Sequence, residues 1–343
     1  MTEAVLRRGS EDDAAGICRL LARCFPDNAK SDEAILRWQY FGSPYGDPVI
    51  MVMDADSEIV GAYTSIRYPA NVDGELTQIG LGIDAAIDRS HQARGNFGPM
   101  ASALYAATGE AGMPLTVCYP NKNSVKGIAR VGWQEIGLLR THLLPLDTDF
   151  YANRSGLPRF AVAIARRALK LRLPAIGYDV SESAAPDADV DGLWKTLAPT
   201  VRNGVIRDSR WFQWRYADRP GKGAYRYFSV RHRGRLCGVA VTTVREQEGA
   251  DFLFVLELLA VGGAAARSLV HEIAARVEGV AGVILATLPG TSTSDLAKRA
   301  GLRLVPQRFE PKQLHFGVVD NVALQHDRRG ERWTLGWGDL DHV

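Results

Sequence analysis

The sequence predicts an α/β protein, a mixed β-sheet flanked by helices, built from two tandem modules. Apolar segments of strand length alternate with amphipathic segments of helix length along the chain. The length of 343 residues corresponds to about two domains of typical size. The pattern Trp-x-Tyr-x3-Pro occurs at Trp38–Pro44 and again at Trp214–Pro220, 176 positions later. A repeat of this period predicts two copies of one supersecondary unit.

Both copies are expected to contain similar elements in the same order. In the first copy we expect a strand near Val5 and helices at Asp12–Cys24 and Ser31–Tyr40, with Ser31 as N-cap. Strands at 48–54, 58–69 and 77–87, a helix at 96–111, a strand at 114–119, a helix at 122–131 and strands at 133–146 follow. The second copy is expected to have helices at 191–199 and 209–217, strands at 225–231, 235–245 and 251–260, a helix at 262–277, a strand at 282–287, a helix at 292–300 and strands at 302–307 and 312–318.

These elements divide the chain into four predicted segments. They are an N-terminal domain at 1–147, a linker at 148–178, a C-terminal domain at 179–320 and a tail at 321–343. The linker contains a basic and apolar stretch, Arg159–Leu173, which reads either as a membrane-surface helix or as an inter-domain helix with solvated arginines. We favour the inter-domain helix, because basic helices usually present a solvated face.

Composition excludes several classes of function. Lys and Arg number 41 and Asp and Glu 39, a net charge of +2 that gives no drive toward nucleic acid or an anionic membrane. The four cysteines form no Cys-x-x-Cys pair and the histidines show no metal-ligand spacing, so no metal site is predicted. The most apolar run, Phe252–Ala266, contains Glu257 and is too short to span a membrane. We therefore expect a cytoplasmic protein without membrane insertion.

The segment Ile87–Gly98 follows a predicted strand and precedes an apolar helix. A turn with glycines at a helix N-terminus directs several backbone N–H groups at one point and suits an anion such as a pyrophosphate. Gly95 would permit close approach of the backbone, and Arg94 would add positive charge. The turn matches neither the P-loop nor the dinucleotide fingerprint. A plain connection is the alternative, because such turns are common.

This arrangement resembles the GNAT superfamily of acyl-CoA-dependent N-acyltransferases. The family motif Gln/Arg-x-x-Gly-x-Gly/Ala is matched at Gln92 and Gly95 and departs at Phe97. A second family pattern, Asn-x-x-Ala-x3-Tyr-x3-Gly-Phe, keeps its spacing over Asn121–Trp133, with Ile128 at the tyrosine position. That tyrosine protonates the leaving thiolate in many relatives, so the resemblance leaves the acid unassigned.

The resemblance implies acetyl-CoA as acyl donor and a set of cofactor-binding positions. These positions are Ala85, Ala86, Ile87, Gln92, Ala93, Arg94, Gly95, Asn96, Phe97, Gly98, Asn121 and Ser124. The first three would act through the main chain, where an N–H polarises the thioester. Asp84, the nearest carboxylate upstream, is the candidate general base, and a salt-bridged structural Asp is the equal alternative. The second copy has Val261–Ala266 at the turn and Ala297 at the tyrosine position, so we expect it to be degenerate and to shape the acceptor site.

Three acidic residues outside the turn, one in an apolar strand and two in the tail, are further candidates for binding a partner group. Glu257 lies in an apolar strand and therefore needs a partner, either structural or in a cleft shared by the two copies. In the tail, Asp339 or Asp341 would be able to pair with an acceptor ammonium. The alternative is a terminal strand anchored by Trp333 and Trp337.

The resulting expectation is an N-acetyltransferase that acylates a primary amine of a small molecule, with an amino sugar of surface-polysaccharide synthesis as one acceptor class. A homodimer is allowed, and no nucleic-acid partner is expected. The alternative is a non-catalytic acyl-CoA-binding scaffold with the same fold, favoured by Ile128 and the degenerate second copy. An aminoacyl-tRNA-dependent peptidyl transferase is disfavoured by the intact turn and the lack of basic excess.

Overall fold

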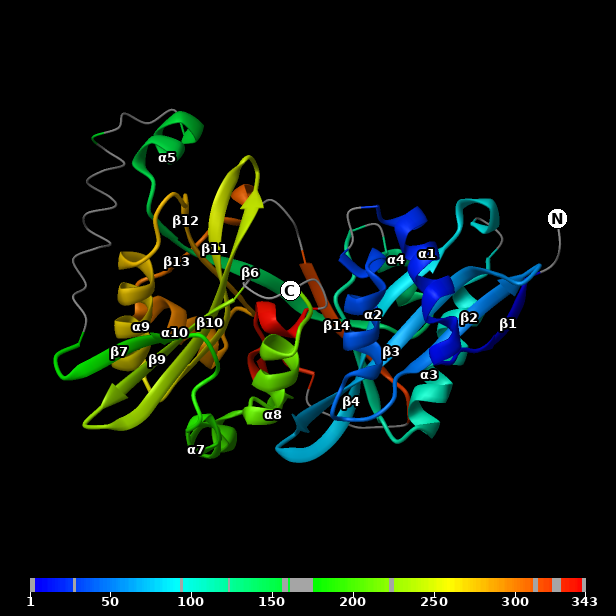
Figure 1. The fold of residues 1–343 in the computed structure, drawn as a ribbon, viewed down its shortest axis with the longest axis horizontal. Helices are drawn as coiled ribbons and strands as arrows, with labels where there is room; N and C mark the ends of the chain where they lie inside the picture. The colour runs from blue at the N-terminus through cyan, green and yellow to red at the C-terminus, as the bar shows by residue number, and fades with distance from the viewer. Residues whose placement is uncertain are drawn as a thin grey trace.

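The computed structural model describes residues 4–26, 29–92, 95–122, 124–155, 160, 175–221, 225–310, 314–322 and 328–340. Within them, 15 strands join into one mixed sheet that runs through both halves of the molecule (Figure 1). The strands of the first half are β1 (Val5–Arg8), β2 (Val49–Ala55), β3 (Glu58–Val72), β4 (Glu75–Ile87), β5 (Leu115–Cys118) and β6 (Gln134–Pro145). Those of the second half are β7 (Tyr178–Ser183), β8 (Asn203–Val205), β9 (Arg226–His232), β10 (Arg235–Gln247), β11 (Ala250–Ala260), β12 (Gly282–Thr287), β13 (Arg303–Leu304), β14 (Leu314–Asp320) and β15 (Trp333–Thr334). The mixed sheet confirms the predicted fold class.

Read inward from its two ends, the sheet presents the strands of the two halves in corresponding order, β1 to β5 from one end and β7, β9, β10, β11 and β12 from the other. It runs β1-β2-β3-β4-β5-β14-β6-β12-β11-β10-β9-β7. The pairs β4–β5 and β11–β12 are parallel, and the other neighbours on this path are antiparallel. The two halves therefore have matching topologies, as the sequence repeat predicts.

At the centre of the sheet the two halves exchange strands. β14 comes from the second half, yet it pairs with β5 and β6 of the first half. β6 comes from the first half and pairs with β12 of the second, and in Figure 1 it runs from one half into the other. The predicted domains 1–147 and 179–320 are thus joined by one hydrogen-bonded sheet through β6 and β14.

Helices cover both faces of the sheet. The first half carries α1 (Ala14–Cys24), α2 (Glu33–Phe41), α3 (Phe97–Glu110), α4 (Val125–Ala129) and α5 (Thr148–Ser155). The second half carries α7 (Val190–Leu197), α8 (Ser209–Phe212), α9 (Gly263–Ala275) and α10 (Ser292–Ala300). α1, α2, α7 and α8 pack over one apolar core that is continuous through both halves, while α3 and the pair α9 and α10 cover separate cores on the other face. Alternate residues of β2 divide between the two faces, as a strand period of two requires.

The structure corrects three local predictions. The second helix begins at Glu33, and the Asp32 side chain, not Ser31, accepts the N-cap hydrogen bond from the Ala34 N–H. The segment predicted as one helix at 209–217 is α8 followed by a π-turn at Gln213–Ala217. The strands predicted at 133–146 form the single long strand β6.

The predicted stretch Arg159–Leu173 lies outside the described residues, apart from Phe160. Among the residues that the structure describes, no helix is long and apolar enough to cross a membrane.

Candidate functional site

The pairing of β4 with β5 ends in the middle of the first half, where β5 itself ends at Cys118. Their parallel ladder pairs Gly80 with Thr116 and ends at Gly82 and Cys118. β4 continues to Ile87 with β3 on one side and, in the described part of the chain, no strand on the other. The main chain of residues 83–87 is therefore available on that side to bind a ligand.

A β-bulge lies in this part of β4. Ala62 pairs with Ala86 and Thr64 with Ile83, so Asp84 and Ala85 together lie opposite Tyr63. Asp84 has a φ of +56°, which is unusual for a residue other than glycine. The bulge changes the direction of the main chain at Ala85–Ile87, the segment predicted to act through its N–H groups.

The carboxylate of Asp84 is buried and already bound. Lys30 Nζ lies 2.6 Å from Oδ2, and the Tyr40 hydroxyl donates to the same oxygen at 2.7 Å. The side chains of Lys30 and Asp84 are only 2% and 3% exposed. The alternative of a salt-bridged Asp84 agrees with this geometry, and a base that receives a proton from a substrate amine would have to leave this ion pair.

The predicted anion turn connects β4 to α3. The Gln92 side chain donates to the Ile87 carbonyl at 2.7 Å, and Asn96 Nδ2 donates to the His91 carbonyl at 3.2 Å. Gly95 has a φ of +74°, and a Cβ added at Gly95 or Gly98 would meet no atom within 4 Å. Both glycines thus face open space at the start of α3, which suits the approach of an anionic ligand. Ala93 and Arg94 lie outside the described residues.

Phe97, which departs from the family motif, is the first residue of α3. Its ring centroid lies 6.0 Å from that of Tyr63, and a Cβ at Gly127 would lie 3.7 Å from the ring. Phe97 therefore packs between the bulge side of β3 and α4. The bulky side chain of Phe97 is packed against Tyr63 and α4, away from the open glycines of the turn.

Asn121 and Ser124 lie at the start of α4. Asn121 Oδ1 accepts two hydrogen bonds from Ser124, one from its N–H at 3.2 Å and one from its hydroxyl at 3.2 Å. Ile128, at the family's tyrosine position, is 5% exposed. An isoleucine has no proton to donate, so the family's acid is not supplied at this position.

A cluster of hydroxyl and thiol groups beside the ladder end was not predicted from the sequence. The Tyr63 and Tyr105 hydroxyl oxygens are 2.9 Å apart, and Tyr63 Oη lies 3.6 Å from Cys118 Sγ. Burial raises the pKa of the Cys118 thiol to about 11, so it is protonated at neutral pH. A Cβ at Gly82 would lie 2.8 Å from this thiol, which places the cluster directly against β4. Three residues separated by 42 and 55 positions give no local signal in sequence.

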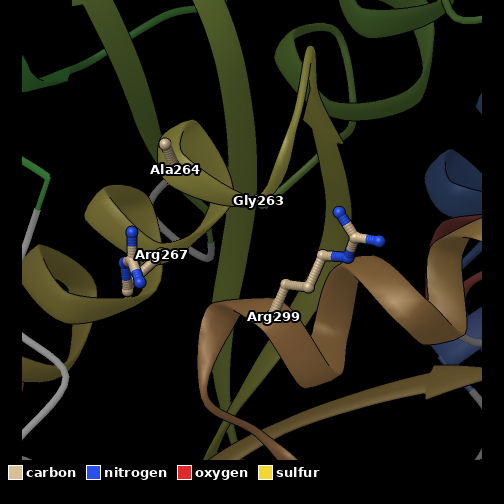
Figure 2. A pocket seen from close by; sticks show the side chains of 4 residues that line it. All are labelled: Gly263, Ala264, Arg267 and Arg299. Atoms are coloured by element: carbon tan, nitrogen blue, oxygen red, sulfur yellow. The ribbon is translucent and has the colours of Figure 1, made fainter.

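The second half has a cavity at the position that corresponds to the turn. It measures about 460 Å³ and is lined by Gly263, Ala264, Arg267 and Arg299. Figure 2 shows Arg267 on the first turns of α9 and Arg299 on the neighbouring α10. The Gln/Arg-x-x-Gly start is absent here, so this half shares the topology of the first site without its motif.

The other acidic residues that were singled out bind protein groups. Glu257 accepts from Arg207 at 2.8 Å and from the Trp211 and Tyr216 side chains. Asp339 lies 2.6 Å from Arg207 Nη2 and is 1% exposed. Glu257 thus has the partner that its apolar surroundings require, and the Asp339 carboxylate is directed at Arg207. Asp341 lies outside the described residues.

Comparisons with known proteins bear on the family of the first part and on the overall fold. Residues 5–136 match the family model described as acetyltransferase (GNAT) domain. No curated protein sequence matches. The GCN5-related N-acetyltransferase of Anabaena variabilis has a TM-score of 0.68 at 10% identity over 93% of this chain and 73% of its own. A probable N-acyltransferase of Enterococcus faecalis has a TM-score of 0.67 at 12% identity over 93% of this chain and 73% of its own. Eis1 of Mycobacterium abscessus has a TM-score of 0.60 at 12% identity over 93% of this chain and 74% of its own.

At these identities the solved structures show a shared fold, and they share it over almost the whole chain. Together with the family match, they define the class: an α/β protein of GNAT fold whose first part matches an acetyltransferase domain. Residues 5–136 therefore form a GNAT acetyltransferase domain.

Proposed function

We propose that this protein is an acetyl-CoA-dependent N-acetyltransferase that acylates a primary amine of a small molecule. The observation that carries the proposal is the unpaired side of β4 beyond Gly82, beside an open glycine turn at the start of α3. An amino sugar is our preferred acceptor, because the near-neutral chain offers little attraction to polyanions.

The residues present fit acyl-CoA. The pyrophosphate would lie at the turn of Gly95 and Gly98, where backbone N–H groups and the α3 dipole favour negative charge. The pantetheine would extend the sheet along residues 83–87, where β4 lacks a neighbour on one side. The thioester carbonyl would then accept a hydrogen bond from a main-chain N–H at Ala85–Ile87. Asn121 and Ser124 would border the pantetheine from the start of α4.

Acetyl-CoA supplies an activated thioester to the reaction. The amine nitrogen of the acceptor forms a bond to the carbonyl carbon, and the bond from that carbon to sulfur breaks. The amine loses one proton, and the departing thiolate gains one as free CoA. The protein's part is to hold the thioester against a fixed N–H donor and to orient the amine.

Titration calorimetry with acetyl-CoA tests the proposal. We expect binding to the wild-type protein and a loss of roughly ten-fold or more in the Gly95→Glu variant, since a carboxylate would occupy the anion turn. Gly112→Glu is the matched control: Gly112 is also an exposed glycine with positive φ and open space, but it follows the far end of α3. Absence of binding to the wild type, or equal losses in both variants, would refute the proposal.

A non-catalytic acyl-CoA-binding role is the second candidate. Two observations favour it: Ile128 replaces the family's acid, and Asp84 is bound by Lys30. A thiol-release assay with a panel of small amines, amino sugars included, separates the two. Release of CoA that depends on any amine would exclude the scaffold role.

A further inference from the structure

The two halves place a carboxylate at corresponding bulges. In the first half, Asp84 is in the bulge of β4 opposite β3. In the second half, Val241 pairs with Glu257 and Thr242 with Val255, so Leu256 is the extra residue and Glu257 adjoins it. β11 corresponds to β4 in the strand order, so the two acidic residues lie in or next to the bulge of corresponding strands.

The partners of the two carboxylates also correspond. Tyr40 and Tyr216 are the tyrosines of the Trp-x-Tyr repeat, and each donates its hydroxyl to its bulge carboxylate at 2.7 Å. A buried cation completes each group: Lys30 lies 2.6 Å from Asp84 and Arg207 lies 2.8 Å from Glu257. We call these groups the first clamp (Lys30, Tyr40, Asp84) and the second clamp (Arg207, Tyr216, Glu257).

Because both halves have a clamp, the clamp does not depend on the acyl-CoA-binding motif. The second half lacks the Gln/Arg-x-x-Gly motif, yet it keeps the cation, the tyrosine and the carboxylate at its bulge. What the clamps share is a bulged strand. At Asp84 the main chain has a φ of +56°, and such a conformation persists when surrounding contacts hold it. Lys30 and Tyr40 provide these contacts.

We infer that Asp84 is a positioning residue: the first clamp fixes the β4 bulge and thereby directs the N–H groups of Ala85–Ile87 toward the acyl-CoA thioester. This inference rests on the proposed function. Asp84 acts through the main chain that follows it, and its carboxylate stays bound to Lys30 and Tyr40 throughout. Exposures of 2% and 3% for Lys30 and Asp84 agree with a role that needs no contact with substrate.

The repeat offers a matched pair of mild variants, Tyr40→Phe and Tyr216→Phe. Each removes one hydroxyl that donates at 2.7 Å to a bulge carboxylate. We expect Tyr40→Phe to weaken acetyl-CoA binding several-fold and Tyr216→Phe to leave it unchanged. Neither variant should alter binding of adenosine 3′,5′-bisphosphate, which lacks the pantetheine and the thioester. Asp84→Asn, with Glu257→Gln as its counterpart, should show the same contrast with a larger loss, roughly ten-fold.

A general base would behave differently. If Asp84 were a general base, Asp84→Asn would lower kcat and change the pH profile, and acetyl-CoA affinity would stay at the wild-type value. Tyr40→Phe would then have little effect. That result would overturn the inference, as would equal effects of the two tyrosine variants on acetyl-CoA binding.

Hydrogen exchange of the free protein tests the clamp without any ligand. We expect Tyr40→Phe to speed amide exchange at residues 83–87 relative to Tyr216→Phe. Unchanged exchange there would refute the clamp. Faster exchange in a protein whose wild type binds no acetyl-CoA would refute the proposed function alone.

Discussion

Trp38 and Trp214 bind each other reciprocally. The indole Nε1 of Trp38 donates to the Trp214 carbonyl at 2.9 Å, and Trp214 Nε1 donates to the Trp38 carbonyl at 3.3 Å. The two residues occupy the same position of the sequence repeat, so the same surface of each half meets its counterpart. This is the geometry of an isologous dimer interface, here formed within one chain.

Replacing Trp38 by Phe should therefore weaken the contact between the halves. The variant leaves the buried Trp214 carbonyl without its indole donor. Trp133→Phe is the control: Trp133 is also buried, and its Nε1 has no hydrogen-bond partner among the described residues. We expect Trp38→Phe to cost about 1–2 kcal/mol more free energy of unfolding than Trp133→Phe, measured in urea. Equal costs would contradict the prediction.

His142 should make stability depend on pH. It is fully buried between Thr287 and Ser294, and burial lowers its pKa to about 4. The unfolded chain binds a proton near pH 6.5, whereas the folded protein resists it until about pH 4, so stability falls as pH drops through this window. One such proton gives a slope of up to about 1.4 kcal/mol per pH unit.

Unfolding curves of His142→Gln between pH 7 and 4 check this prediction, with His232→Gln as the control because His232 lies at the rim of the sheet beside Gly177. The slope should flatten in His142→Gln only. An unchanged slope in that variant would show that other groups cause the pH dependence.

The two glycines of the turn should respond oppositely to alanine. Gly95 has a left-handed φ, so Gly95→Ala should cost about 1–2 kcal/mol of stability. Gly98 lies within α3 with open space around it, so Gly98→Ala should gain up to about 1 kcal/mol from helix propensity. Urea unfolding measures both, and changes of the same sign would show that the turn is held differently.

Asp339 should be important for stability through Arg207. Both side chains are buried, and their charged atoms are 2.6 Å apart. Asp339→Ala should cost about 3 kcal/mol, the lower end for breaking a buried ion pair, because Glu257 still faces Arg207. The exposed pair of Lys298 and Asp295 is the comparison, where Asp295→Ala should change stability by less than about 0.5 kcal/mol. A small loss in Asp339→Ala would contradict this ranking.

Most elements could be predicted because their signals are local. Apolar periodicity and polar breaks located β2, β3 and β4 to within a few residues, and the repeated Trp-x-Tyr-x3-Pro pattern indicated the matching halves. The partner of a strand is not a local property, so the placement of β14 between β5 and β6 was not predicted. The short strands β8 and β15, of three and two residues, are too short to show a periodicity, and β8 is held by both β15 and β3.

The candidate site shows the same limit of local signals. A motif of adjacent residues such as Gln92–Gly95 can be read directly. The ion pair of Lys30 and Asp84 joins positions 54 residues apart and depends on how the 3-10 turn Ala29–Ser31 packs against β4, which no spacing encodes. The Tyr63, Tyr105 and Cys118 cluster was missed for the same reason.

The exchange of β14 and β6 determines when the molecule can be completed during synthesis. β5 is made early, but the strand that covers its open edge begins at Leu314, about 200 residues later. Until β14 leaves the ribosome, β5 of the nascent first half has one unpaired edge. Such an edge can pair with strands of other chains. The first half is therefore closed by a strand translated about 200 residues after β5, and a ribosome that stalls before Leu314 would leave the first half with an open sheet.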